Sequence, residues 1–176
     1  MAQYCNFPVH TSGAEGSLSL GKPLNQQRFH LEMVQVLIRH GDRSPAMFIP
    51  NMDNGNYDHD CTFRTKNRDY KQMFEEYTQA TRHVTTREFQ KGLASFHNLL
   101  PSGRTCRIGQ LTQKGFLQHF TLGKHLRSAY GSLINTDIKS SDLHVRSTQR
   151  PRCVQSAAAF LYGLLTKDTI MKGEAT

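Results

Sequence analysis

The sequence has no long apolar run and no closely paired cysteines. No stretch approaches the ~20 consecutive apolar residues of a membrane-spanning helix, and Met1 is not followed by a charged and then an apolar segment of the kind that forms a secretory signal. The absence of any C-x-x-C pair argues against a zinc site and against a thioredoxin-like redox site. We therefore expect no membrane segment, no metal and no other cofactor in this chain.

The basic residues form no block, although they outnumber the acidic ones. The chain of 176 residues contains 22 Lys and Arg and 14 Asp and Glu, which gives a formal net charge of +8. A positive field favours anionic partners such as phosphoesters and sulfated glycans. Nucleic acid is not expected, because the charges are dispersed and no zinc-finger, recognition-helix or aromatic RNA-binding signature is present.

The cysteine count leaves two interpretations open. An even number permits two disulfides in any of three connectivities, which a secretory compartment would allow and the cytosol would not. Four reduced and buried thiols fit the count equally well. The residues concerned are Cys5, Cys61, Cys106 and Cys153.

The segment Val34–Pro45 is the most informative part of the chain. Its nearly continuous apolar start predicts a strand at Glu32–Ile38 that is covered on both faces, as in a parallel sheet. The strand leads directly into residues 39–45, which read R-H-G-D-R-S-P, and Gly41 permits a tight turn there. Because ligands of open α/β sheets bind at the carboxyl ends of strands, we expect a binding site at these residues.

The residue types of this segment suit phosphoryl transfer. A neutral imidazole such as that of His40 can attack phosphorus and divide one difficult displacement into two easier ones. The phosphoryl group stays anionic throughout, so catalysis rests mostly on cations placed around its oxygens, and Arg39 and Arg43 flank the histidine. The alternative is that both arginines are surface charges and that His40 is a structural histidine. We would favour that interpretation for a lone histidine, but not for this pattern after an apolar strand.

A second strand is predicted at Asp142–Ser147, where apolar and polar residues alternate. It also ends near an arginine, Arg146. If the two strands are parallel neighbours, Arg146 meets Arg39 and Arg43 around one anion, and guanidinium forks match phosphate oxygens well. The alternative for Arg146 is a charge at a strand end that faces solvent.

Three helices are predicted from apolar spacing and capping residues. The first begins near Asp69 and has one apolar face, made of Tyr70, Met73, Phe74 and Tyr77. The second spans Leu111–Tyr130, with Thr112 as its N-cap, Gly131 as its end and a buried side made of Phe116, Phe120, Leu122 and Leu126. The third follows Thr148 as N-cap, has Pro151 in its first turn and a core face made of Val154, Ala157, Ala158, Leu161 and Leu165.

Other motifs extend the pattern. The first helix is followed by a second block, which contains Gly109-Gln110-Leu111-Thr112 and then Gly115, Gln118, Leu122-Gly123, Leu126-Arg127 and Tyr130. A third block contains Val145-Arg146-Ser147-Thr148, Arg152 and Ser156-Ala157. With the segment at His40, these blocks resemble the acid phosphatase branch of the histidine phosphatase superfamily.

The resemblance implies a fold and a set of roles. The fold is a three-layer α/β/α sandwich with a mostly parallel sheet, and we expect this chain to be its N-terminal part, with the C-terminal half missing. Residues 1–30 would form an extended arm, 31–166 the N-terminal part of the α/β domain and 167–176 a divergent tail. The resemblance makes His40 the nucleophile that forms a phosphohistidine, and makes Arg39, Arg43 and Arg146 the phosphate-binding residues, with no metal.

The resemblance also implies a substrate and a compartment. It is strongest to a member that removes phosphate from 2-phosphoxylose in the glycosaminoglycan–protein linkage region, in the Golgi or secretory pathway. Partners would be a phosphorylated glycan or another small phosphomonoester, with an anionic glycosaminoglycan as a further ligand.

The chain departs from the family at the general acid. That branch takes the leaving-group proton from the Asp of a late His-Asp pair, and no such pair follows Arg146. The His59-Asp60 dipeptide lies too early and is interpreted as a loop feature. An alternative is therefore a truncated, catalytically impaired fragment that binds phosphate but lacks the general acid.

Overall fold

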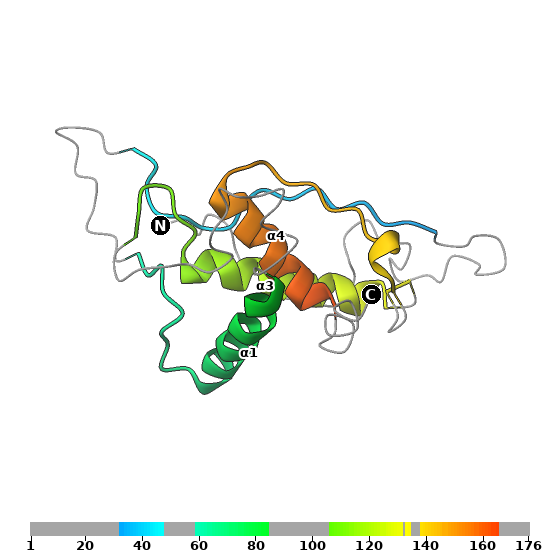
Figure 1. Cartoon of the computed structure of the whole chain (residues 1–176), viewed down its shortest axis with the longest axis horizontal. Coiled ribbons are helices and arrows are strands. Elements are labelled where there is room, and N and C mark those ends of the chain that lie inside the picture. The colour runs from blue at the N-terminus through cyan, green and yellow to red at the C-terminus, as the bar shows by residue number, and fades with distance from the viewer. Residues whose placement is uncertain (1–31, 48–58, 85–105, 132, 135–137, 166–176) are drawn as a thin grey trace.

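The computed structural model describes residues 32–47, 59–84, 106–131, 133–134 and 138–165 (Figure 1). Within them the elements follow in the order α1 (Arg68–Val84), α3 (Gln113–Ala129), a 3-10 helix η1 (Ser140–Asp142) and α4 (Pro151–Leu164). The predicted arm at 1–30 and tail at 167–176 lie outside the described residues. None of the helices in the described ranges is long and apolar enough to cross a membrane.

The two segments predicted as strands cross the molecule without forming a ladder in the described ranges. They run in the same direction in Figure 1, and the pairing found there is one isolated antiparallel bridge between Arg43 and Leu111. The expected cover on both faces is not found, since Met33 is 67% exposed and Leu37 fully exposed. A strand is buried on both faces only where it pairs with neighbouring strands and helices pack on both sides of the sheet. The described residues supply no such pairing for this segment.

The helix predicted near Asp69 is confirmed as α1. Its first turn is capped by Asn67, whose side-chain oxygen accepts hydrogen bonds from the backbone N–H groups of Asp69 and Tyr70 at 3.0 and 3.2 Å. Phe74 and Tyr77 are buried, as the apolar spacing predicts, whereas Tyr70 remains 41% exposed. The predicted face therefore packs from its second turn onward.

Helix α3 begins as predicted and buries a more polar face than predicted. The hydroxyl of Thr112 caps it by accepting a hydrogen bond from the N–H of Gly115 at 3.1 Å. The helix ends at Tyr130 as C-cap, one residue before the predicted Gly131. Its buried residues are Gly115, Phe116, Leu117, Gln118, His119 and Gly123; Phe116 alone of the predicted four belongs to them.

Helix α4 corrects two predictions. Pro151 occupies the first turn as expected, but the N-cap is Arg150, which makes no side-chain capping bond, and not Thr148. The buried face is turned relative to the predicted one and consists of Gln155, Ser156, Ala159, Phe160, Gly163 and Leu164.

The crossing of α3 and α4 explains that turned face. A Cβ on Gly163 would lie 2.1 Å from the carbonyl oxygen of Phe120, and a Cβ on Gly123 would lie 2.1 Å from that of Phe160. The two helices thus touch backbone to backbone, which only glycine at both positions permits. The residues beside Gly163 are buried by this contact, although their apolar spacing alone does not indicate it.

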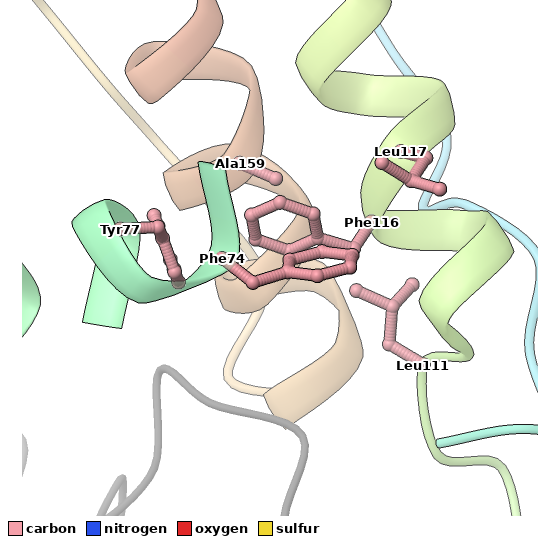
Figure 2. Packing of buried hydrophobic residues seen from close by; sticks show 6 residues of the cluster. All are labelled: Phe74, Tyr77, Leu111, Phe116, Leu117 and Ala159. Atoms are coloured by element: carbon pink, nitrogen blue, oxygen red, sulfur yellow. The ribbon is translucent and has the colours of Figure 1, made fainter. Parts of the chain in front are cut away.

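An aromatic cluster joins the three helices. Figure 2 shows Phe74 and Tyr77 of α1 directed at Phe116 of α3, and the rings of Tyr77 and Phe116 meet edge to face with centroids 4.7 Å apart. Phe63 stacks on Phe74 at 4.3 Å, and Tyr162 of α4 meets Tyr77 at 5.2 Å. Such pairs stabilise by about 0.5–1.5 kcal/mol each beyond the area they bury. The cluster therefore holds α1 against the α3–α4 pair.

A disulfide bond settles the state of two of the four cysteines. Cys61 and Cys106 are bonded across a sequence separation of 45 residues, with Cα atoms 5.3 Å apart. Cys153 on α4 is a free thiol, and Cys5 lies outside the described residues. The alternative of four reduced thiols is thus excluded by this pair.

Candidate functional site

The loop that follows His40 is held by the N-terminal halves of α3 and α4. The N–H of Gly41 donates to the Ser156 hydroxyl at 3.1 Å, and that hydroxyl donates in turn to the carbonyl of Arg152 at 2.7 Å. The N–H of Asp42 donates to the side-chain oxygen of Gln118 at 2.8 Å. Both backbone donors after His40 are therefore satisfied by side chains from two different helices.

Asp42 is held by the residue that caps α3. The Thr112 hydroxyl donates to the Asp42 carboxylate at 2.7 Å, and the Thr112 N–H donates to the Asp42 carbonyl at 3.0 Å. Farther along the loop, the N–H of Ser44 donates to the carbonyl of Gln110 at 2.9 Å. Together these hydrogen bonds fix residues 41–44 against the segment that leads into α3.

Glycine is required at position 41 because the backbone of α3 approaches it closely, and not because the chain turns there. A Cβ there would lie 2.3 Å from the carbonyl oxygen of Gly115, and a Cβ on Gly115 would lie 2.1 Å from the carbonyl oxygen of Asp42. Among the described glycines, positive φ occurs at Gly109, with φ 67°. The sequence-based reason for Gly41 is thus corrected, because the loop packs with its backbone directly on the backbone of α3.

The imidazole of His40 is oriented by its own chain. Its Nδ1 lies 2.8 Å from the carbonyl oxygen of Gly41. Because a carbonyl oxygen only accepts, Nδ1 carries the proton and Nε2 carries the lone pair. The ring is half-buried, so Nε2 is the nitrogen suited to act as a nucleophile.

The three predicted phosphate-binding arginines differ in their surroundings. Arg43 is half-buried and donates from Nη1 to the carbonyl of Ser44 at 2.9 Å, whereas Arg39 and Arg146 are exposed. The ion pair found within the described ranges is Lys71–Glu75 on α1, so none of the three arginines is paired with a carboxylate there. No hydrogen bond among those residues joins Arg146 to the loop, and its convergence with Arg39 and Arg43 stays a prediction.

The His59-Asp60 dipeptide has a structural role, as expected of a loop feature. The Asp60 carboxylate accepts hydrogen bonds from the N–H and the hydroxyl of Thr62, both at 2.7 Å. The backbone carbonyl of Asp60 accepts a hydrogen bond from the N–H of Gln113 at 2.7 Å. Asp60 thereby joins the disulfide-bonded loop to the first turn of α3.

Sequence reasoning missed one residue at the site, His119. Its side chain is 5% exposed and is hydrogen-bonded to the backbone of Arg39. Burial lowers its pKa to about 4; the bond to Arg39 opposes that shift, and the nearby His40 adds to it. The available signal was spacing: Gly115, Gln118 and His119 stand at i, i+3 and i+4 on one face of α3.

A comparison of the sequence with models of protein families finds one family that covers most of the chain. The model of the family described as "Histidine phosphatase superfamily (branch 2)" matches residues 30–175 of this chain. The chain belongs to this family. Membership implies an α/β fold, to which the described helices α1, α3 and α4 contribute.

Several curated proteins are similar to this member of the histidine phosphatase superfamily. Human 2-phosphoxylose phosphatase 1 is 34% identical over 165 residues, which cover 92% of this chain and 32% of that protein. Counting factor 60 of Dictyostelium discoideum is 31% identical over 180 residues, covering 97% of this chain and 38% of that protein. Bovine lysosomal acid phosphatase is 44% identical over 65 residues, covering 37% of this chain and 15% of that protein.

The chain thus spans about a third of the length of the phosphoxylose phosphatases that it matches. No solved structure matches it significantly.

Proposed function

We propose that this chain carries the nucleophile and the phosphate-binding residues of a phosphomonoesterase that works through a phosphohistidine. The observation that supports the proposal most directly is the Nδ1 hydrogen bond of His40, which leaves a lone pair on Nε2 in a loop held by α3 and α4. Nε2 attacks phosphorus and the bond from phosphorus to the ester oxygen breaks; the oxygen departs as an alkoxide or phenoxide and takes its proton from water. Water then attacks the phosphohistidine, which releases phosphate and regenerates His40.

Arg39, Arg43 and Arg146 are proposed to bind the phosphoryl oxygens. Each supplies a fork of N–H donors, and none is neutralised by a carboxylate in the described residues. Cations that are already placed around the phosphoryl group stabilise the transition state without reorganising during the reaction. The general acid is not assigned to any described residue.

The substrate is proposed to be a phosphorylated sugar of the glycosaminoglycan linkage region. The support is the likeness to 2-phosphoxylose phosphatase 1 over 92% of the chain. A net charge of +8 favours such an anionic glycan. The Cys61–Cys106 disulfide fits an oxidising compartment, and we therefore place the protein in the secretory pathway.

The proposal is tested by trapping the intermediate. The chain is incubated with an activated aryl phosphate, whose good leaving group depends little on a general acid, and is then denatured in alkali and mapped by mass spectrometry. Phosphate is expected on His40 and is expected to be absent from His40→Ala. His59→Ala serves as the matched control and should be labelled like the wild type. Turnover that survives His40→Ala unchanged would refute the mechanism.

The alternative function, a phosphate-binding chain without catalysis, predicts a different result. Vanadate or phosphate would then bind with an affinity that depends on Arg43, while turnover of the aryl phosphate stays at the level of His40→Ala. Measuring binding and turnover on one preparation separates the two functions.

A further inference from the structure

Helix α3 contacts the nucleophile loop through three residues of one face. Gly115 lies against the backbone of residues 41 and 42, and Gln118 accepts the N–H of Asp42. His119, the third, is hydrogen-bonded to the backbone of Arg39, the residue that precedes His40. These contacts fix the chain on both sides of the nucleophile.

The two ring nitrogens of His119 have different surroundings. Nδ1 is buried and has no hydrogen-bond partner in the described part of the chain. Nε2 is therefore the nitrogen that bonds to Arg39. The acceptor there is a backbone carbonyl, because the bond raises the pKa of the ring and so favours its protonated form. Nε2 thus carries the proton.

We propose that His119 is a positioning residue for the nucleophile, an inference that rests on the proposed function. Its Nε2–H holds the Arg39 carbonyl and so fixes the backbone immediately before His40. Ser156 and Gln118 fix the two residues immediately after it. His40 then has little freedom to move relative to the phosphorus it attacks, and Arg39 leaves the same anchored peptide toward the phosphoryl oxygens.

The position of His119 suits this role better than that of a core residue. It is almost completely buried, yet it adds no ring to the aromatic cluster, to which α3 contributes Phe116 and, against Tyr162, Phe120. Burial also keeps the imidazole neutral at mildly acidic pH, since its pKa is about 4. The ring can therefore keep a single N–H donor directed at Arg39 without adding a further positive charge beside His40.

The test compares three variants of the full chain. His119→Leu removes the donor, and His119→Gln keeps a neutral N–H donor at about the position of Nε2. His125→Leu is the matched control, because His125 lies on the same helix and also has a buried Nδ1 without a partner in the described residues. The His40 tautomer is read from imidazole ¹⁵N NMR, and the rate of aryl phosphate turnover is measured per folded molecule.

In the wild type, in His119→Gln and in His125→Leu, His40 is expected to carry its proton on Nδ1. In His119→Leu the tautomers should mix, and kcat should fall by up to about 100-fold with little change in KM, as for a nucleophile displaced by about an ångström. A wild-type tautomer and a wild-type kcat in His119→Leu would overturn the proposal. If His119→Leu does not fold, His119→Asn replaces it, because its shorter amide does not reach Arg39.

Two readouts keep this inference apart from the proposed function. Labelling of wild-type His40 tests the phosphatase mechanism alone. If the wild type is not labelled but the His40 tautomers mix in His119→Leu, the proposed function fails and the positioning role stands. If the wild type is labelled and His119→Leu matches it in both readouts, the function stands and the positioning role fails.

Discussion

Replacing Gly115 by alanine sets two well-defined effects against each other. In an exposed helix interior, alanine is more stable than glycine by about 1 kcal/mol, because it restricts the unfolded chain. At this position, however, the new Cβ would lie 2.1 Å from the carbonyl oxygen of Asp42 and 2.8 Å from Cδ1 of Leu111. Asp42 cannot move away freely, since Thr112 and Gln118 hold it through backbone hydrogen bonds.

The clash should outweigh the gain in helix propensity. Forcing a methyl group into a packed contact costs about 1–3 kcal/mol, and weakening one of the Asp42 hydrogen bonds adds about 1 kcal/mol. After subtraction of the propensity gain, Gly115→Ala should lower the free energy of unfolding by roughly 1–3 kcal/mol. Displacement of the loop should also lower turnover, because His40 lies two residues from Asp42.

The assay is denaturant unfolding followed by circular dichroism, with turnover measured on the same samples. Ser128→Ala is the matched control on an exposed position of α3, and it should raise the free energy of unfolding by up to about 0.5 kcal/mol. If Gly115→Ala is as stabilising as the propensity scale predicts for an open helix, the loop does not lie on α3 and the site geometry is wrong.

Three further predictions concern the site. Arg43→Lys keeps the charge but loses the guanidinium fork, so phosphate affinity measured by calorimetry should fall clearly; equal affinity would argue against a bidentate role. Ser156→Ala leaves the buried N–H of Gly41 without its acceptor and should lower the free energy of unfolding by about 1–3 kcal/mol. The exposed Ser147→Ala should change it by less than about 0.5 kcal/mol. His119 should take up a proton near pH 6.5 in the unfolded chain, but only near pH 4 in the folded chain, where burial lowers its pKa. Stability should therefore fall as the pH drops through this window, by up to roughly 3 kcal/mol, and His119→Gln should remove that part of the pH dependence in urea titrations.

Local interactions made the helices predictable from sequence. The cap of α3 needs only Thr112 and the N–H of a residue three positions later. Pro151 lacks the N–H that a first turn would leave unpaired, which places the start of α4. The buried pair Phe74 and Tyr77 follows from apolar spacing within one helix. In each case the decisive groups lie within a few residues of one another.

The motif around His40 was readable for a different reason. Its residue types, an imidazole between two guanidinium groups, state their chemistry without knowledge of the fold. The family blocks then named Gln118 and Ser156 as members of a pattern. The pattern said nothing of what those side chains bind, because the Gly41–Ser156 hydrogen bond joins residues 115 positions apart.

Only the tertiary structure decided the contacts between distant segments. The buried face of α4 is set by the backbone contact at Gly123 and Gly163, and Gly41 is required by the approach of Gly115. His119 is a site residue only because α3 packs under the chain at Arg39. The order of apolar residues indicated the buried side of α1, but not that of α4. The meeting of two backbones depends on residues far apart in the chain, so no local pattern contains it.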